Sequence, residues 1–378
     1  MSPTLIERVS HVADKVAAPA AAEVDRDARF PHEAIDALKA DKLLSTLIPV
    51  ELGGEGATIA DVARCVEALS QACASTAMIY AMHQIQVACL VRHARSEAMR
   101  ELMREVVSSQ LLLASATTEI GIGGDVKSSS CAVESDGVTF TLEKNAPVIS
   151  YGAYADVILA TARRSPDATP GDQVLVVCRS VDTKLEANGE WNTLGFRGTC
   201  SPGFLLSSSG SLEQILEDSY GDISAQTMLP VSHILWAAVW LGIATAATSK
   251  ARSYVQAAAR RSPGVTPPGA LRLAELTVVQ QQFSALARSA ARTFDEADDN
   301  VLGSIAFAID MNTLKLSASQ LVVDVVGRAM VITGISGYRE DSPYSVGRHL
   351  RDAHGAQVMI NNDRILANNA QLMLVYRG

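Results

Sequence analysis

The order of hydrophobic patterns along this 378-residue chain constrains its fold most strongly. Residues 1–112 carry apolar side chains at three- and four-residue spacing, which is typical of amphipathic helices. Residues 113–220 contain short runs rich in β-branched residues, separated by turn signals such as the SDG at 135–137. Residues 221–378 return to long, Ala-rich helical patterns. The sequence therefore predicts an α+β protein with an N-terminal helical domain, a middle antiparallel β domain and a C-terminal helical bundle.

This order excludes several kinds of protein. A dinucleotide-binding Rossmann domain needs strands and helices in alternation, and that alternation is missing. Hydrophobic residues make up 48% of the chain and charged residues 19%, which is a globular composition with enough apolar material for a core. The net charge is −9 and basic residues form no long run, so we expect a small-molecule substrate and no nucleic-acid partner.

The cysteines and the apolar stretches bear on where the protein works. No pair among the six cysteines has C-x-x-C spacing, so we expect no metal site and reduced, mostly buried thiols. The N-terminus lacks a basic-then-apolar signal pattern. The most apolar stretch, residues 234–249, is too short and too polar at its ends to span a membrane. These features predict a cytoplasmic protein without a membrane partner.

The segment TTEIGIGGD, residues 117–125, has three glycines within four positions. Glycine lets a backbone approach a phosphate or a flat ring closely because no Cβ intervenes. Both the dinucleotide fingerprint and the P-loop motif would need a glycine at position 126, directly before Lys127, and Val126 stands there instead. Both phosphate-loop hypotheses fail, and the pattern alone indicates an ordinary turn that leads into the β region.

The same segment resembles the T-E-P-G-A-G-S-D motif of the acyl-CoA dehydrogenase superfamily of flavoproteins, which includes flavin-dependent monooxygenases of the same fold. Four further segments are similar to motifs of that family and occur in the same order: IPVELGGEG, LEKNAPVISYGAYAD, TLGFRGT and GYREDSPYSVGRHLRDA. The resemblance spans nearly the whole chain. It implies the layout predicted above, with a four-helix bundle as the C-terminal domain.

The resemblance also implies a flavin, FAD or alternatively FMN, between the β domain and the C-terminal helices. A hydroxyl and an amide beside the ring would stabilise negative charge as the flavin is reduced. The positions that match the family's cofactor-binding motifs, in the glycine segment and in the following strand pair, are Thr117, Thr118, Gly123, Gly124, Ile149 and Ser150.

The chain departs from the family at its catalytic base. The carboxylate that usually follows the RDA motif aligns with Ile360, which cannot take a proton. Some members place the base on the first long C-terminal helix, where this chain has Ser232 and His233. Gly124 replaces a serine that helps to bind CoA, and Val148 replaces the tryptophan that covers the flavin.

Two histidines and one serine are the candidate catalytic residues. His83 lies on a helix that borders the substrate pocket in the family, and His233 stands with Ser232 at the alternative base position. Histidine titrates near neutral pH and suits proton transfer, although a histidine in an apolar helix is often a core residue. Asp352 in the RDA motif is expected to form an ion pair with Arg348 or Arg351 rather than to act as a base.

Three functions therefore stay open. The first is an acyl-CoA dehydrogenase type of oxidoreductase that acts on an acyl thioester or similar substrate with a displaced base. The second is a flavin-dependent monooxygenase that uses reduced flavin and O2 and needs no α-proton base. The third is a non-catalytic flavin-binding scaffold. The resemblance implies a homotetramer or homodimer, with an electron-transfer flavoprotein or a flavin reductase as the redox partner.

Overall fold

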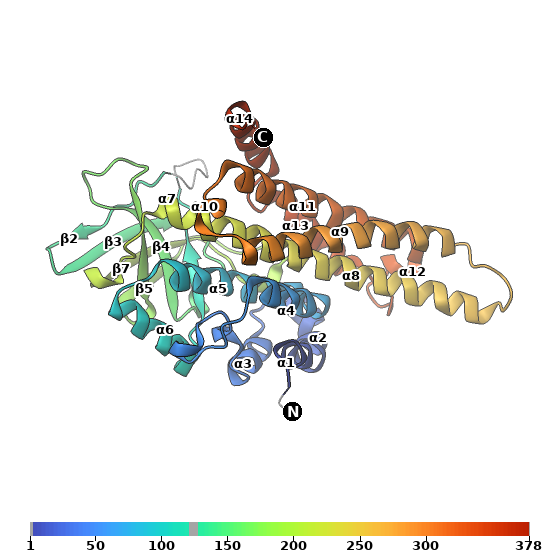
Figure 1. The fold of residues 1–378 in the computed structure, drawn as a ribbon. Helices are drawn as coiled ribbons and strands as arrows, with labels where there is room; N and C mark the ends of the chain where they lie inside the picture. The colour runs from blue at the N-terminus through green and yellow to red at the C-terminus, as the bar shows by residue number, and fades with distance from the viewer. Residues whose placement is uncertain (1–2, 121–127, 378) are drawn as a thin grey trace.

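A computed structural model describes residues 3–120 and 128–377. Helices form both ends of the chain and two β-sheets lie between them, so the predicted fold class is confirmed. Figure 1 shows the sheets at one end of the molecule, the N-terminal helices beneath, and the long C-terminal helices extending to the other end.

The first region is helical, as predicted. Thr58 caps the start of the fourth helix, because its hydroxyl accepts a hydrogen bond from Asp61 N at 3.1 Å and the Asp61 carboxylate accepts one from Thr58 N at 3.4 Å. The helices are α1 (Leu5–Val12), α2 (Ala18–Arg26), α3 (His32–Ala40), α4 (Ile59–Ala72), α5 (Ala74–His93) and α6 (Glu97–Ser109).

The middle region forms two sheets, with strand orders β1-β4-β5 and β2-β3-β7-β6. The strands are β1 (Leu113–Ala116), β2 (Glu134–Ser135), β3 (Thr139–Ala146), β4 (Val157–Arg163), β5 (Gln173–Arg179), β6 (Thr183–Ala187) and β7 (Phe204–Ser211). The prediction of a purely antiparallel domain is wrong at one pair, because β1 runs parallel to β4. The chain makes the β2–β3 ribbon of the other sheet between these two strands, and such a long connection permits a parallel pair.

The last region contains the long helices. They are α8 (Leu229–Arg261), α9 (Ala270–Glu296), α11 (Ile305–Thr333) and α13 (Gly347–Val358), with the shorter α7 (Tyr220–Ile223), α10 (Asp299–Leu302), α12 (Ile335–Tyr338) and α14 (Asn362–Val375). Helix α8 packs against α9, α11 and α13, so the predicted four-helix bundle is present. The far ends of α8 and α9 project beyond the rest of the molecule as a helical hairpin, as Figure 1 shows.

Helix α8 also holds the N-terminal helices, since it packs against α4 and α5. The approach to α4 is so close that a Cβ at Gly242 would lie 2.6 Å from the Glu67 carbonyl oxygen and 2.5 Å from Ser70 Cβ. Ser70 Oγ donates a hydrogen bond to Val239 O at 2.6 Å across the same contact. Because α8 is covered on several sides, apolar residues occupy nearly its whole circumference in the first half.

Within the described residues, three helical segments are long and apolar enough to cross a membrane by length and composition alone: Ala74–His93, Tyr220–Arg261 and Ile305–Thr333. The length argument made for residues 234–249 is therefore wrong, because that stretch lies inside a 33-residue helix. In the fold, 89%, 94% and 44% of the respective apolar windows are buried inside the protein. Packing against other helices accounts for the hydropathy of the first two segments.

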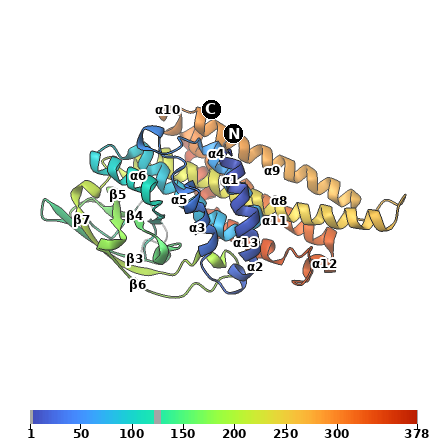
Figure 2. The same cartoon turned by 90° about the horizontal axis from the view of Figure 1, so that it is seen from below.

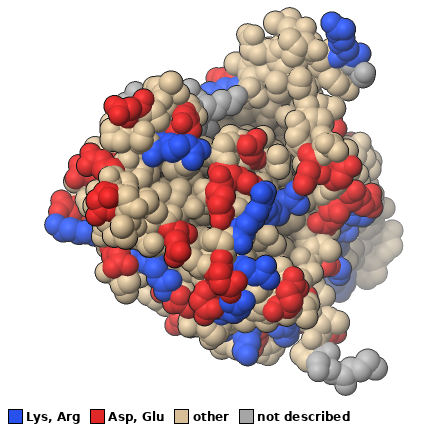
Figure 3. Space-filling view, turned by 60° about the vertical axis from the view of Figure 1, so that its left-hand side comes forward, with Lys and Arg blue, Asp and Glu red and all other residues tan. Residues whose placement is uncertain are grey.

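Charged side chains of both signs are interspersed on the face of the molecule in Figure 3. One ion pair is instead buried between the sheets: Lys144 Nζ on β3 lies 3.1 Å from Glu119 Oε2, with exposed fractions of 1% and 6%. Glu119 also accepts hydrogen bonds from Ser129 Oγ and Ser130 N, and Lys144 donates one to Thr161 O at 2.9 Å. Burial acts to raise the pKa of Glu119, but the hydrogen bonds from Ser130 and Ser129 and the Lys144 charge outweigh it and lower the pKa.

We predict that Lys144→Met lowers the free energy of unfolding by about 3–5 kcal/mol, because it leaves the buried Glu119 charge without its partner. Denaturant unfolding followed by circular dichroism measures this loss.

Lys184→Met on β6 is the matched control. It removes a lysine that pairs with Glu186 in solvent, so the unfolding midpoint should stay near that of the wild type. Equal midpoints for Lys144→Met and the wild type would contradict a structural role for the buried pair.

Candidate functional site

Two of the predicted cofactor-binding segments lie side by side at the ends of β1 and β3. Thr118 Oγ1 donates a hydrogen bond to Val148 O at 3.4 Å, which joins the two segments directly. Thr117, Thr118 and Ser150 are partly exposed, and Ser150 has no hydrogen-bond partner among the described residues for either its hydroxyl or its amide. This junction therefore presents neutral hydroxyl and amide donors. Gly123 and Gly124 lie outside the described residues.

The turn after β3 is held firmly against β1. Tyr151 Oη donates to Leu113 O at 2.8 Å, and Tyr151 N donates to Thr199 O at 2.9 Å. Ile149 is fully buried and its amide donates to Pro202 O, so this residue supports the turn and its amide is not open to a ligand. Of the predicted pair at this turn, Ser150 alone offers accessible polar atoms.

His83 is a structural residue, and its prediction as a catalytic residue is corrected here. Leu113 N donates to His83 Nδ1 at 3.0 Å, and His83 Nε2 therefore carries the proton and donates to Leu44 O at 2.7 Å. Both ring nitrogens are engaged with backbone groups, and the side chain is fully buried. Burial lowers the pKa of His83 to about 4, so the ring is neutral at pH 7.

Ser232 and His233 lie in the first turns of α8. Ser232 Oγ donates to Met228 O at 2.5 Å along the helix, so this hydroxyl is committed to the backbone and does not suit a base. His233 Nδ1 donates to Met311 O on α11 at 3.0 Å, and Nε2 has no partner among the described residues. Burial, more than the nearby Lys315, lowers the pKa of His233 to about 4. His233 thus presents a neutral, buried nitrogen with an open lone pair.

The loop where the family carries its base is fixed by a lysine that the sequence analysis did not single out. Lys315 Nζ on α11 donates to Ile360 O and to Asn362 Oδ1, both at 2.6 Å. Burial lowers the pKa of Lys315 to about 8. Ile360 has a φ of 44° and is 44% exposed. Its side chain is apolar, so this position supplies no carboxylate. In the sequence, Lys315 is distinguished by its position as a lysine inside the apolar pattern of residues 314–326.

A cavity of about 330 Å³ lies between the start of α8, α11, α14 and the β5 end of the first sheet. Apolar and neutral polar residues line it, including Tyr220, Leu229, Phe307, Met311 and Asn312. No Asp, Glu, Lys or His is among its described lining residues. Asn312 was also not anticipated from the sequence; its Nδ2 donates to Asn369 Oδ1 at 2.7 Å, inside the bundle.

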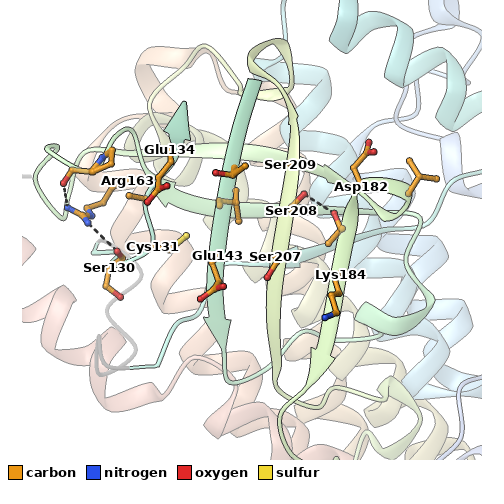
Figure 4. Close-up of a pocket in the computed structure, with 16 residues that line it drawn as sticks. Ser130, Cys131, Glu134, Glu143, Arg163, Asp182, Lys184, Ser207, Ser208 and Ser209 are labelled. Atoms are coloured by element: carbon orange, nitrogen blue, oxygen red, sulfur yellow. Dashed lines mark hydrogen bonds between the residues drawn. The ribbon is translucent and has the colours of Figure 1, made fainter. Parts of the chain in front are cut away.

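A larger cleft, of about 970 Å³, lies elsewhere. It covers the outer face of the second sheet, and the close-up in Figure 4 shows Glu143, Lys184 and Ser207 across its floor and Arg163 at one side. It contains none of the predicted cofactor or catalytic residues, and neither does the described lining of the 330 Å³ cavity. Its size therefore does not make it the functional site, and the chemistry favours the junction of the β region with the bundle.

The RDA motif is used differently from the prediction. Asp352 Oδ1 accepts a hydrogen bond from Phe196 N at 2.7 Å, and no ion pair joins Asp352 to Arg348 or Arg351 within the described residues. Arg351 pairs instead with Asp25 and with Glu340. Burial raises the pKa of Asp352 to about 6. This carboxylate therefore holds the loop of the β region against α13.

These features define a helix–β–helix protein with a polar turn where the sheets meet the bundle. The acyl-CoA dehydrogenase N-terminal domain matches residues 3–110, and the acyl-CoA dehydrogenase C-terminal domain matches residues 221–368. The chain belongs to the acyl-CoA dehydrogenase family.

Two relatives of known name match this chain over nearly its whole length. The cyclohex-1-ene-1-carbonyl-CoA dehydrogenase of Geobacter metallireducens is 27% identical over 95% of this chain and 94% of its own length. The mitochondrial short-chain specific acyl-CoA dehydrogenase of Bos taurus is 24% identical over 97% and 88%.

Among solved structures, FMN-bound TdsC of Paenibacillus sp. A11-2 has a TM-score of 0.86 at 20% identity, covering 99% of this chain and 98% of its own. Another structure of TdsC is described as a dibenzothiophene monooxygenase. Butyryl-CoA dehydrogenase of Megasphaera elsdenii has a TM-score of 0.84 at 22% identity, covering 98% and 97%. At these identities, the structures establish the shared fold.

We predict that His83→Ala lowers the free energy of unfolding by about 2–4 kcal/mol, because it leaves Leu113 N buried without its partner and leaves Leu44 O with Gln84 Nε2 as its remaining donor. The depressed pKa of His83 also makes the unfolded chain bind one more proton between pH 6.5 and about 4. The wild type therefore loses stability as the pH falls through that window, and the variant should lose less. Denaturant unfolding at pH 7 and pH 5 measures both effects.

His354→Ala is the control, since His354 is exposed on α13. It should leave both the stability and its pH dependence near those of the wild type. The structural assignment of His83 fails if His83→Ala unfolds like this control.

Proposed function

We propose that this protein is a flavin-dependent oxidoreductase that acts on a small, largely apolar substrate. The observation that carries the proposal is the junction of Thr118 with the turn at 148–150, where Ser150 keeps an open hydroxyl and amide. Neutral donors of this kind suit the carbonyl and nitrogen edge of a flavin ring, and the 38% exposed Val148 offers an apolar surface beside them. The residues present therefore fit the cofactor that the family resemblance implies.

We assign Thr117, Thr118 and Ser150 to the flavin ring. When bound, the flavin supplies the redox chemistry, accepting a hydride from a substrate or passing electrons to O2. The chain positions the ring edge through the turn that Tyr151 anchors, and it offers hydroxyl and amide hydrogens to developing negative charge. Gly123 and Gly124 keep their proposed cofactor-binding role, and they lie outside the described residues.

Two reactions suit such a site, and the residues at the two base positions distinguish between them. The named dehydrogenase relatives support oxidation of an acyl thioester, which requires a base for the α-proton. Both known base positions carry residues other than Asp or Glu, namely Ile360 at one and Ser232 with His233 at the other. This favours a flavin-dependent monooxygenase, whose chemistry needs no α-proton base. We propose His233 Nε2 as a hydrogen-bond acceptor in either reaction, not as a strong base, because of its low pKa.

The proposal extends to partners. Several apolar side chains on the C-terminal helices are exposed, including Val331, Ile335 and Leu374, which are 58%, 72% and 79% exposed. Such surfaces are typical of subunit contacts, and we propose a homodimer or homotetramer, which sedimentation at micromolar concentration distinguishes from a monomer. An electron-transfer flavoprotein would serve dehydrogenation, and a flavin reductase would serve oxygenation.

We predict that the purified protein binds FAD or FMN and that Ser150→Ala weakens this binding roughly five- to tenfold, the equivalent of about one hydrogen bond. Visible-absorbance titration of the flavin-free protein with each flavin measures the affinity and decides between them.

Ser207→Ala, on the outer face of the second sheet, is the control and should leave flavin affinity unchanged. If the wild-type protein binds neither flavin, the cofactor assignment is wrong. The hypothesis of a flavin-binding scaffold then fails as well, because its ligand is the same flavin.

We predict that acyl-CoA thioesters do not bleach the bound flavin under anaerobic conditions, whereas a flavin reductase with O2 supports oxygenation of a small apolar substrate such as an aromatic heterocycle. Product analysis by mass spectrometry after incubation under ¹⁸O2 measures oxygen incorporation.

His233→Ala should lower turnover at least tenfold while His354→Ala does not. Rapid bleaching by an acyl-CoA would instead establish dehydrogenation, and unchanged turnover in His233→Ala would remove that residue from the site.

A further inference from the structure

A second cleft, of about 500 Å³, lies between α2, the far half of α8 and the start of α13. Figure 2 shows these elements near one another, with α12 beside them. Lys250 on α8 lines this cleft and lies 17 residues beyond His233, which is roughly 25 Å along the helix at about 1.5 Å per residue. The cleft is therefore separate from the proposed flavin site.

The cleft holds two cations without carboxylate partners among the described residues. Lys250 Nζ donates to Pro343 O at 3.3 Å, and Arg348 Nη2 donates to Ala72 O at 3.0 Å. The other arginines of the cleft are neutralised: Arg351 pairs with Asp25 and Glu340, and Arg26 pairs with Asp27. Burial and Arg348 lower the pKa of Lys250, so nearby negative charge would stabilise its charged form.

His349 is a buried polar group that lines the same cleft. It is 6% exposed, and its Nδ1 has no hydrogen-bond partner among the described residues. Burial, together with Arg348, Lys250 and Arg351, lowers the pKa of its ring to about 3. Buried polar atoms in proteins are normally hydrogen-bonded, so this open ring nitrogen in the wall of the cleft is a group that a ligand would satisfy.

The backbone adds donors at the same place. Helix α13 has no side-chain cap, and the amides of Arg348 and His349 in its first turn have no acceptor among the described residues. Ser342 Oγ and Ser345 Oγ accept hydrogen bonds from Tyr344 N and Gly347 N, which leaves both hydroxyl hydrogens able to donate to a ligand. A helix N-terminus with free amides attracts anions.

We propose that this cleft binds a phosphate group. The ammonium of Lys250, the guanidinium of Arg348, the two free amides and the serine hydroxyls supply more donors than a carboxylate can use, and a tetrahedral phosphate with several acceptor oxygens matches them. The phosphate can be free or can belong to a nucleotide. The proposal does not depend on the flavin site.

Glu340 competes with this ligand. Its carboxylate lies against the start of α13, since a Cβ at Gly347 would be 2.4 Å from Glu340 Oε1, and it also pairs with Arg351 at 3.1 Å. The Glu340 side chain is 69% exposed, so it can leave the helix end when an anion arrives. Removing its charge should therefore strengthen phosphate binding, whereas removing a cation should weaken it.

Calorimetric titration of the full-length protein with inorganic phosphate and, separately, with ADP tests the proposal. Lys250→Met should weaken binding at least tenfold, Lys250→Arg should retain it, and Glu340→Gln should strengthen it at least threefold. Arg252→Gln is the matched control, because Arg252 is exposed on the same helix and does not line the cleft. Thermal unfolding of each variant confirms that it is folded.

The two ligands separate the sources of the phosphate. Binding of inorganic phosphate indicates a site for the free anion, and binding of ADP alone indicates a nucleotide site. Both should persist in protein stripped of flavin, so failure of the flavin assignment leaves this result intact. Absence of binding of either ligand at millimolar concentration, or equal affinity in Lys250→Met and the wild type, overturns the proposal.

Discussion

The contact of α8 with α4 at Gly242 is the constraint on which the rest of the structure depends. The two backbones approach until a Cβ at Gly242 would collide with the Glu67 carbonyl, and Ser70 bonds to Val239 across the gap. This places α8 between the N-terminal helices and the other helices of the bundle, buried on several sides. Its burial fixes His233 near α11 and, at the far end, Lys250 near α13. One helix thereby positions groups at two separate sites.

The proposed flavin site depends on a different principle, which is that a rigid backbone presents a few open donors. The hydroxyl and amide of Tyr151 and the amide of Ile149 form hydrogen bonds that fix the turn after β3. The hydroxyl and amide of Ser150, between them, have no partner among the described residues. The buried Glu119–Lys144 pair stabilises the neighbouring region, with Glu119 bonded to Ser129 and thus joined to the residues that follow the glycine segment. In the bundle, Lys315 Nζ donates a hydrogen bond to Ile360 O and so holds this loop in place. The Ile360 side chain itself cannot exchange a proton.

Much of the architecture could be predicted from the chain, while the state of individual polar groups could not. Periodicity predicted the helix–β–helix order. His83 and His233 looked alike in the sequence, since both lie in apolar helices. The first has both nitrogens bonded to backbone 30 and 39 residues away, and the second has one nitrogen open. Lys315 was missed because its acceptor lies 45 residues along the chain.

The sequence by itself determined the helix–β–helix layout, excluded the phosphate-loop motifs at the glycine segment, and left both known base positions without a carboxylate. These properties depend on residue type and short-range spacing, which can be read directly from the sequence. The tertiary structure alone decided that β1 pairs in parallel with β4, that His83 is a core residue, and that Lys250, Arg348 and His349 share one cleft. Those properties depend on contacts between distant segments, because burial and hydrogen-bond partners exist only after the helices have packed.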